Sequence, residues 1–333
     1  MPESGLRCSK RQTSFKNKGD YKIRRKITFN SQLSTFNSTK KMRFSVADHI
    51  FELAMVAMCR PVPVPRNFRP FLTTAEGEPL FRVVLDAEVE PRTDNPLQTF
   101  DYELQVGDCT LAIYADEYRL TIRSAGEATI VCPFVGAGEV AEYRANLFGE
   151  GKAPNSVMYD HALCFAYSFA TLPHKTLLIH SSVVVKEGRA VMCLGESGTG
   201  KSTHTRLWLE NIEGAERLND DGPVVRVHTD GRVRVYGSPW SGKGAVYRQE
   251  NCPLAGFLRL SQAPENRITR LSRIASFGAL LPSTLPTLQK EERTLDQICS
   301  ALSEMIVAVP SYALACLPDA DAAKLSYTTI FKV

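Results

Sequence analysis

Long apolar runs are missing from this 333-residue sequence. No stretch of about eighteen apolar residues occurs, which is the length that a membrane-spanning helix requires, and no apolar segment follows the charged residues near the start. We therefore expect neither a membrane span nor a secretory signal. Paired cysteines are missing as well, because the nine cysteines include no C-x-x-C pair. Their scatter argues against a zinc site or a disulfide framework and predicts reduced thiols in a cytoplasmic protein.

Acidic residues are scarce in the first part of the chain, where twelve of the forty Lys and Arg residues stand against only Glu3 and Asp20. The segment is rich in Ser, Thr, Asn and Lys and has no hydrophobic periodicity, so we predict a basic, disordered extension over residues 1–43. Its role stays open among a plain addition ahead of a start at Met42, a nucleic-acid or membrane contact, and an organelle-targeting segment. The rest of the chain is mildly acidic and gives no strong nucleic-acid or membrane signal.

Residues 44–150 have the pattern of a strand-rich N-terminal lobe. An amphipathic pattern at its start predicts a short helix near residues 45–58, and the four prolines of RPVPVPRNFRP predict an extended connector after that helix. From residue 81 onward apolar and polar residues alternate, with a turn at residues 115–117, which predicts a β-meander. We find no catalytic motif in this lobe.

Residues 151–333 are predicted to form an α/β domain with a mixed sheet. A helix is expected from Asn155, with its apolar residues on one face. The segment TLLIHSSVVVKEGRAVMCLG predicts two antiparallel strands joined by a tight turn from Lys186 to Arg189. The remaining pattern predicts, in order, a hairpin that turns at residues 229–231, a strand at 254–260, helices at 274–281 and 292–307, and a terminal pair of strands.

The segment GESGTGKS fits the phosphate-binding loop pattern G-x-x-x-x-G-K-[ST], with Gly195, Gly200, Lys201 and Ser202 in the fixed positions. A buried strand is predicted directly before the loop and a helix directly after it. The start of a helix offers unpaired N–H groups and the positive end of a dipole, and glycines let the backbone approach an anion closely. We therefore predict that the loop binds the phosphates of ATP. The alternative is a glycine-rich turn that only joins strand and helix.

The predicted nucleotide contacts extend over nine residues, namely Gly195, Glu196, Ser197, Gly198, Thr199, Gly200, Lys201, Ser202 and Thr203. Lys201 should reach the outer phosphates, and the Ser202 hydroxyl should ligate Mg²⁺. For Glu196, a plain surface position and a ligand contact are both open. Thr203 is expected to cap the helix or to pack.

A second candidate cluster stands in RLNDDGPVV, where Asp220 and Asp221 precede Gly222 at a turn. Phosphoryl transfer needs Mg²⁺ held by oxygen ligands and benefits from a base that positions the acceptor hydroxyl, so two carboxylates can divide these tasks. We expect Asp220 as the base and Asp221 as the metal ligand, with the roles exchangeable because adjacency does not give geometry. The alternative is a plain Asp-Asp-Gly hairpin turn. His180, on the strand before the loop strand, is either a site residue or a core histidine.

The segments IHSSVVVKEGRAVMCLGESGTGKST and LNDDGPVV resemble the C-terminal catalytic domain of HPr kinase/phosphorylase, whose P-loop fold is related to that of the phosphoenolpyruvate carboxykinases. The resemblance covers residues 175–332 and implies that His180, the loop from Gly195 to Ser202 and both aspartates form one site. The chain departs from the family pattern in its N-terminal half and after the aspartates, where GSPWSGKGAVYR stands. The bacterial phosphocarrier protein is therefore not the expected acceptor. In that segment Lys243 and Arg248 either supply positive charge to the phosphates or lie in a solvated loop.

The motifs and the resemblance together predict a mixed-sheet P-loop kinase domain of the HPr kinase/PEP carboxykinase type, preceded by the strand-rich lobe. The expected activity is a cytoplasmic, ATP- and Mg²⁺-dependent transfer of the γ-phosphoryl group to a hydroxyl of a protein or small molecule. One alternative is an ATP-binding regulatory protein without transfer chemistry. A carboxykinase-like enzyme is less favoured, because the chain is short for its additional machinery. The sequence does not name the acceptor and leaves a homo-oligomer open.

Overall fold

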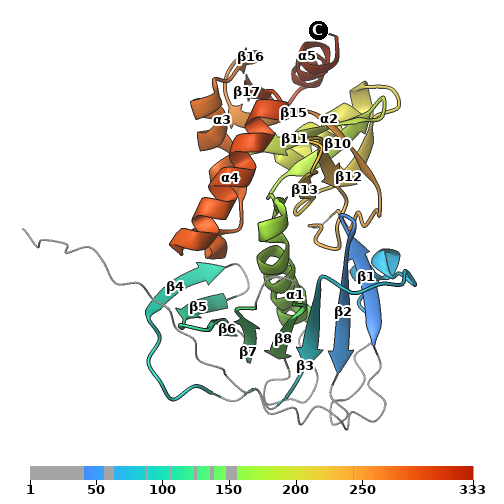
Figure 1. The fold of residues 1–333 in the computed structure, drawn as a ribbon. Helices are drawn as coiled ribbons and strands as arrows, with labels where there is room; N and C mark the ends of the chain where they lie inside the picture. The colour runs from blue at the N-terminus through green and yellow to red at the C-terminus, as the bar shows by residue number, and fades with distance from the viewer. Residues whose placement is uncertain are drawn as a thin grey trace, which may run out of the picture. The chain divides into compact units, whose positions relative to one another are not determined.

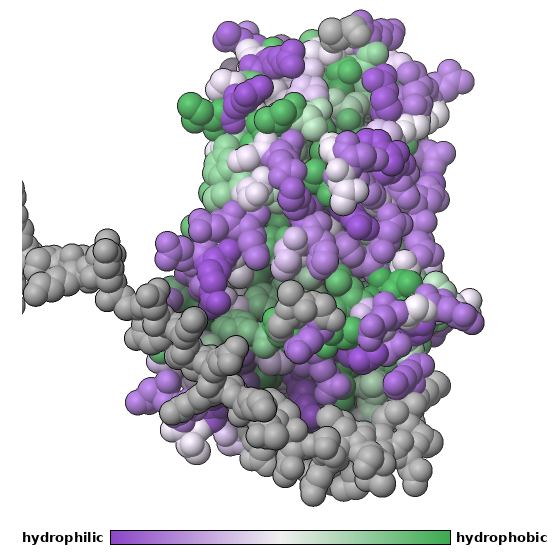
Figure 2. Space-filling view, viewed as in Figure 1, coloured by the Kyte–Doolittle hydropathy of each residue, from purple (hydrophilic) through white to green (hydrophobic). Residues whose placement is uncertain are grey.

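The computed structural model of the protein describes residues 41–55, 64–87, 89, 91–104, 107–123, 126–135, 139–147, 156–242 and 244–332. These residues belong to one compact unit, which combines helices with two mixed β-sheets of eight and nine strands. The extension predicted over residues 1–43 lies outside the described residues except for its last three. None of the described helices combines the length and the apolar composition that crossing a bilayer requires. On the face shown in Figure 2, hydrophilic residues cover most of the described surface, with smaller hydrophobic patches between them.

The first sheet is built around a meander, and its strand order is β1-β2-β3-β8-β7-β6-β5-β4 (Figure 1). Strands β4 to β8 pair antiparallel in chain order, which confirms the predicted meander. Strand β3 pairs in parallel with both β2 and β8, so the sheet is mixed. The strands are β1 (Met42–Val46), β2 (His49–Met55), β3 (Phe81–Leu85), β4 (Gln98–Leu104), β5 (Gly107–Ile113), β6 (Glu117–Arg123), β7 (Glu127–Pro133) and β8 (Ala141–Asn146).

The prediction of a helix near residues 45–58 is wrong for residues 45–55, which are the part that the structure describes. Strands β1 and β2 occupy this stretch and pair antiparallel around Ala47 and Asp48, which both have positive φ. The helix-like spacing arises because six of the seven residues of β2 are buried, so the strand shows no alternation. Periodicity cannot distinguish such a strand from a buried helix.

Part of the proline-rich segment folds into a short 3-10 helix, η1 (Arg66–Phe71), which begins directly after Pro65. Phe68 and Phe71 are fully buried, and the Phe68 ring meets the edge of Trp240 with 5.9 Å between the ring centroids. The predicted extended connector is therefore wrong here, because the two phenylalanines anchor the segment in the core. Residues 60–63 of that segment lie outside the described residues.

Helix α1 (Ser156–Thr171) lies between the two sheets (Figure 1). It contacts β3, β7 and β8 of the first sheet and β9 (Thr176–Leu178) of the second. Met158, Ala162 and Phe165 are buried in a hydrophobic core that includes residues from both sheets. This confirms the helix expected from Asn155, although Asn155 itself lies outside the described residues.

The second sheet combines two antiparallel hairpins with parallel strands. Lys186 pairs with Arg189 at the turn between β10 and β11, and β13 pairs with β14, which confirms both predicted hairpins. Strand β15 pairs in parallel with β11 and β17 and antiparallel with β14, so it connects the parts of the sheet. Besides β9, the strands are β10 (Ser182–Lys186), β11 (Arg189–Leu194), β12 (Glu216–Asn219), β13 (Val224–Val227), β14 (Val233–Tyr236), β15 (Asn251–Gln262), β16 (Arg267–Arg270) and β17 (Ser311–Cys316).

The remaining helices include one that the sequence did not predict. The expected terminal pair of strands is half wrong, because β17 is followed by helix α5, where the Asp319 side chain caps the helix by accepting a hydrogen bond from Ala322 N. The β-branched and aromatic residues near the end of the chain favoured a strand, but this cap and the alanines after it start a helix. The helices are η2 (Leu172–His174), α2 (Lys201–Asn211), α3 (Arg273–Leu280), η3 (Leu281–Ser283), η4 (Pro286–Gln289), α4 (Glu292–Ala308) and α5 (Ala320–Phe331).

Helix α2 is anchored by Trp208, whose side chain is fully buried between α2 and α5. The indole Nε1 donates a hydrogen bond of 2.9 Å to Ser326 Oγ on α5, and the ring meets Tyr327 edge to face. His204 Nε2 lies 3.1 Å from the same Ser326 hydroxyl. These contacts fix the position of α2 and therefore of Lys201 at its N-terminus.

The substitution Trp208→Ala should lower the free energy of unfolding by about 3–5 kcal/mol, because it leaves a cavity where the indole packed. Leu209→Ala on the same helix is the matched control. The Leu209 side chain is 38% exposed, so its loss should change stability by less than about 0.5 kcal/mol. Urea unfolding followed by circular dichroism measures both, and equal losses in the two variants would contradict the anchoring role.

Candidate functional site

The loop between β11 and α2 has a shape that only glycine permits at several positions. A Cβ atom on Gly195 would lie 2.4 Å from Thr199 Oγ1, closer than any real side-chain contact. Gly198 and Gly200 have φ values of +83° and +99°, in the left-handed region that favours glycine. The spacing of glycines seen in the sequence therefore corresponds to a tight loop that ends at a helix N-terminus.

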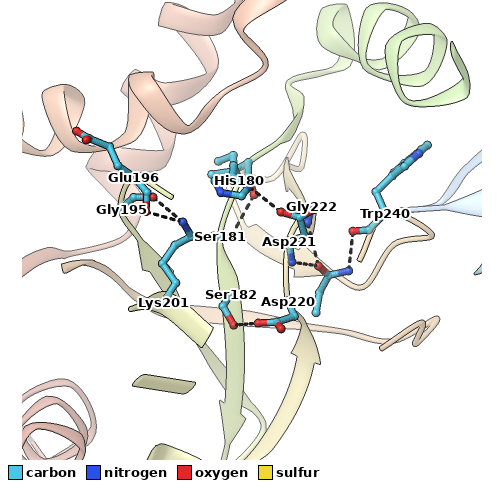
Figure 3. Close-up of polar contacts among 12 residues, drawn as sticks. His180, Ser181, Ser182, Gly195, Glu196, Lys201, Asp220, Asp221, Gly222 and Trp240 are labelled. Atoms are coloured by element: carbon cyan, nitrogen blue, oxygen red, sulfur yellow. Dashed lines mark hydrogen bonds and ion pairs between the residues drawn. The ribbon is translucent and has the colours of Figure 1, made fainter. Parts of the chain in front are cut away.

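Lys201, the first residue of α2, folds back onto this loop (Figure 3). Its Nζ donates hydrogen bonds to the backbone oxygens of Gly195 at 2.7 Å and Glu196 at 3.1 Å. Burial lowers the pKa of the ammonium group, and the nearby carboxylate of Asp221 opposes that shift. An anion in the loop would give this buried cation a charged partner in place of two neutral carbonyl groups.

The first turn of α2 adds backbone donors. The helical ladder begins with His204 N, which donates to Gly200 O at 2.8 Å. The N–H groups of Lys201, Ser202 and Thr203 precede that bond and have no acceptor within the helix. They lie where the positive end of the helix dipole adds to the Lys201 charge, so the loop and the helix start together offer what a polyphosphate requires.

The predicted contact residues differ in exposure. The side chain of Ser202 is exposed and that of Thr203 is half-buried. Glu196 lies largely in solvent, with 82% of its side chain exposed and Oε1 3.5 Å from Arg259 Nη2. Its backbone oxygen accepts from Lys201, so the backbone of Glu196 shapes the loop more than its carboxylate does.

Both aspartates lie at a strand junction, where the antiparallel pairing of two segments passes from β10 with β12 to β9 with β13. Strand β12 pairs with β10, whereas β13 pairs with β9 and β14. Between these pairs, Ile179 N donates to Pro223 O at 3.1 Å and Ser181 N donates to Asp221 O at 2.9 Å. The alternative of a plain Asp-Asp-Gly hairpin turn is therefore wrong, because β12 and β13 are not paired with each other.

The strand junction brings His180 to Asp221 and gives the two carboxylates different surroundings (Figure 3). His180 Nδ1 lies 2.8 Å from Asp221 Oδ1, and both side chains are nearly half exposed. Asp220 is only 8% exposed; it accepts a hydrogen bond of 2.6 Å from Ser182 Oγ, and Arg217 Nη1 lies 3.6 Å away. Asp221 is thus accessible to a ligand, and Asp220 is held beneath it.

A chain of hydroxyl groups connects the buried aspartate to the loop helix. Ser182 Oγ lies 3.0 Å from Thr205 Oγ1 on α2, and both residues are fully buried. The same Ser182 hydroxyl donates to Asp220. The position of Asp220 is therefore tied to α2 through side chains that the sequence analysis did not single out, because Ser and Thr in a strand and a helix carry no recognisable spacing.

Asn219 is a positioning residue that sequence reasoning also missed. Its fully buried Oδ1 accepts hydrogen bonds from the N–H groups of Asp221 at 2.9 Å and Gly222 at 3.1 Å. Its Nδ2 donates to the backbone oxygen of Trp240 at 3.3 Å and to Ser238 Oγ at 3.2 Å. An Asn before Asp-Asp-Gly is a signal for a side-chain-stabilised turn, and that signal was available in the sequence.

The segment after Trp240 passes close over the aspartates. A Cβ atom on Gly242 would lie 3.3 Å from Asp221 Cβ, and one on Gly244 would lie 2.9 Å from Asp220 Oδ2. Lys243, between these glycines, lies outside the described residues. Arg248 does not supply a free charge, because its guanidinium contacts Glu216 at 2.8 Å and Glu250 at 2.7 Å.

Asn67, in the N-terminal half of the chain, connects η1 to the segment beside the aspartates. Asn67 Nδ2 donates to Asp160 Oδ1 on α1 at 2.8 Å and to Pro239 O at 3.2 Å. Trp240 Nε1 in turn donates to the backbone oxygen of Asp160 at 3.2 Å. His161, the next residue on α1, lies near enough to Asp221 for that carboxylate to raise its pKa, although burial lowers the pKa more.

The residues around the loop suit a magnesium ion that shares its ligands with a bound phosphate. Within the described part of the chain, no three His, Cys, Asp or Glu side chains gather into a metal site of their own. Mg²⁺ usually takes one or two carboxylates, with waters and substrate phosphates completing its shell. The Ser202 hydroxyl and the aspartate carboxylates are the oxygen groups that could join such a shell.

No protein-family model matches this chain, and no curated protein matches it either. An inferred function therefore rests on the sequence motifs and on the chemistry of the site. That chemistry consists of a loop and helix start suited to phosphates, a buried lysine, and an accessible aspartate bonded to a histidine.

The substitution Asn219→Ala should lower the free energy of unfolding by about 1–3 kcal/mol, because it leaves two N–H groups of the aspartate turn without their acceptor. Asn211→Ala, at the exposed end of α2, is the control and should cost less than about 0.5 kcal/mol. Guanidinium unfolding measures both variants. A loss at Asn219 no larger than at Asn211 would show that the turn does not depend on this side chain.

Proposed function

We propose that the protein is a MgATP-dependent kinase that transfers the γ-phosphoryl group of ATP to a hydroxyl group of a protein or small molecule. The observation that carries the proposal is the position of the Asp220–Asp221 turn beside the phosphate-binding loop. Asp220 is tied to α2 through Ser182 and Thr205, and the charges of both aspartates act on Lys201. The resemblance to HPr kinase-like sequences supports the same activity.

In this proposal, the loop and Lys201 bind the phosphate chain. The backbone N–H groups at the start of α2 donate to phosphate oxygens, and Lys201 exchanges its two carbonyl partners for the outer phosphates. The exposed Ser202 hydroxyl and a carboxylate ligate Mg²⁺, which would neutralise phosphate charge when bound. Catalysis then consists mainly of positioning and of charge stabilisation in a site prepared in advance.

The exposure of the two carboxylates favours an exchange of the roles that the sequence suggested. A base must reach the acceptor hydroxyl within hydrogen-bond distance, and the half-exposed Asp221 meets that condition better than the buried Asp220. His180 orients Asp221 through the 2.8 Å contact between Nδ1 and Oδ1. Asp220 then serves as the carboxylate on the metal side, together with Ser202.

The substitution Lys201→Ala should weaken MgATP binding by about 10- to 100-fold, because a hydrogen-bonded charge is worth about 1.5–3 kcal/mol. Isothermal titration calorimetry measures the affinity, and the melting temperature reports whether the variant is folded. Lys324→Ala, at an exposed position of α5, is the matched control and should bind as the wild type does. Unchanged MgATP affinity in a folded Lys201→Ala protein would contradict the hypothesis that this loop binds phosphate.

The aspartate variants separate transfer from binding. Asp221→Asn should still bind MgATP but lose phosphoryl transfer by about 10²- to 10⁴-fold, the usual scale for a general base. Asp220→Asn should raise the Mg²⁺ concentration required for half-maximal transfer. Transfer of label from γ-labelled ATP to acceptors in a lysate of the host measures both effects.

Three further outcomes decide between the hypotheses. The opposite pattern in the two single variants would restore Asp220 as the base while keeping the kinase. Full transfer by the Asp220→Asn, Asp221→Asn double variant would contradict the kinase proposal. MgATP binding by the wild type without transfer to any acceptor would favour the ATP-binding regulatory protein.

A further inference from the structure

A cavity of about 560 Å³ opens beside the phosphate-binding loop, on a side that His180 and the two aspartates do not line. The loop and α2 form one wall, β15 forms another, and the segment after β17 forms the third. The lining residues on which the argument depends are Gly198, Thr203, Leu207, Leu260, Gln262 and Leu317. Cavities of this size are typical of sites for small ligands.

The cavity is continuous with the predicted phosphate site. Gly198, Thr199 and Gly200 line it and also belong to the loop. Gln262 is attached to the same loop, because its Nε2 donates to Gly198 O at 3.3 Å. His180, Asp220 and Asp221 are not among its lining residues. A ligand that extends from the cavity across the loop would therefore place one end here and the other at Lys201.

The lining suits an uncharged group with apolar faces and a few polar edges. It contains no Lys, Arg, Asp or Glu side chain. Burial lowers the pKa of its histidine, His204, to about 4, so this ring is neutral at pH 7. Leu207, Leu260 and Leu317 supply apolar surface, whereas Thr203 and Gln262 supply hydrogen-bonding groups. A nucleobase with its ribose has this chemistry, and a second phosphate or carboxylate does not.

We propose that this cavity binds the base and ribose of the nucleotide whose phosphates lie in the loop. The inference rests on the proposed function, because it assumes a nucleotide there. It adds that nucleoside recognition comes partly from the end of β15 and the segment after β17, which lie more than fifty residues beyond the loop in the chain. Affinity for ATP should then exceed affinity for the triphosphate chain alone.

The test compares MgATP with magnesium tripolyphosphate by titration calorimetry on the full chain. Wild type should bind MgATP at least about tenfold more tightly, a difference of about 1.4 kcal/mol. The variant Ala263→Trp fills the cavity from β15's end and should remove that difference while tripolyphosphate affinity stays within about twofold. Leu209→Trp, on α2 but outside the cavity lining, is the control and should leave both affinities unchanged.

The outcomes distinguish this inference from the proposed function. Equal affinity of wild type for the two ligands would overturn the nucleoside site and leave phosphate binding by the loop intact. Failure of wild type to bind either ligand would overturn both proposals. If Ala263→Trp loses both ligands or unfolds, Leu317→Asp decides the question by placing a charge in the lining at a position that is 40% exposed. A selective loss of MgATP affinity in that variant supports the site, and unchanged affinity overturns it.

Discussion

Two backbone hydrogen bonds hold His180 and the aspartate turn together. Ile179 N and Ser181 N donate to the carbonyl oxygens of Pro223 and Asp221, at the point where β9 gives way to β10 and β12 to β13. His180 lies between the two donors in the chain, and this places its side chain beside that of Asp221. Because the strand junction is held by backbone hydrogen bonds, the side chains at these positions do not have to stabilise it and remain available for a ligand.

Buried polar groups behind the strand junction reinforce it. Asn219 uses its amide oxygen for the aspartate turn and its amide nitrogen for the segment that ends at Trp240. Asn67 and Asp160 then tie that segment to η1 and α1. A fully satisfied polar network in a low-dielectric interior is specific in geometry, because any displacement leaves a buried group unpaired. The strand-rich lobe therefore contributes to the order of the site although it carries no catalytic motif.

Local patterns in the sequence were sufficient to predict the loop, α2 and the two hairpins of the second sheet. Each of these depends on neighbours in the chain, such as the glycines of the loop or the turn from Lys186 to Arg189. Strand β2 and helix α5 were predicted wrongly. Because β2 is buried on both faces, its residues do not alternate between apolar and polar. At α5, the Asp319 cap outweighed a composition that favours a strand. The meeting of His180 with Asp221 was implied by the family resemblance but not by spacing.

Contacts between distant segments could not be predicted from the residues at all. Nothing near Asn67 in the sequence indicates that it bonds to both α1 and Pro239, and no pattern shows that β11 pairs with β15. Such pairings are selected by the packing of the whole core, in which helices and both sheets share buried residues. Short-range propensity carries no information about them.

The parallel pairing of β11 has a consequence for the biosynthesis of the protein. Strand β11 ends at Leu194, but its partner β15 begins at Asn251, and β17, the next strand, begins at Ser311. Pairings between such distant segments form late, since long loops must close before the contacts form. Of the second sheet, a ribosome-bound chain that has just exposed the glycine-rich loop holds only β9 and the β10–β11 hairpin. The wall of the neighbouring cavity is complete only when Pro318 has been synthesised, so an unfinished chain carries the motif without a complete site.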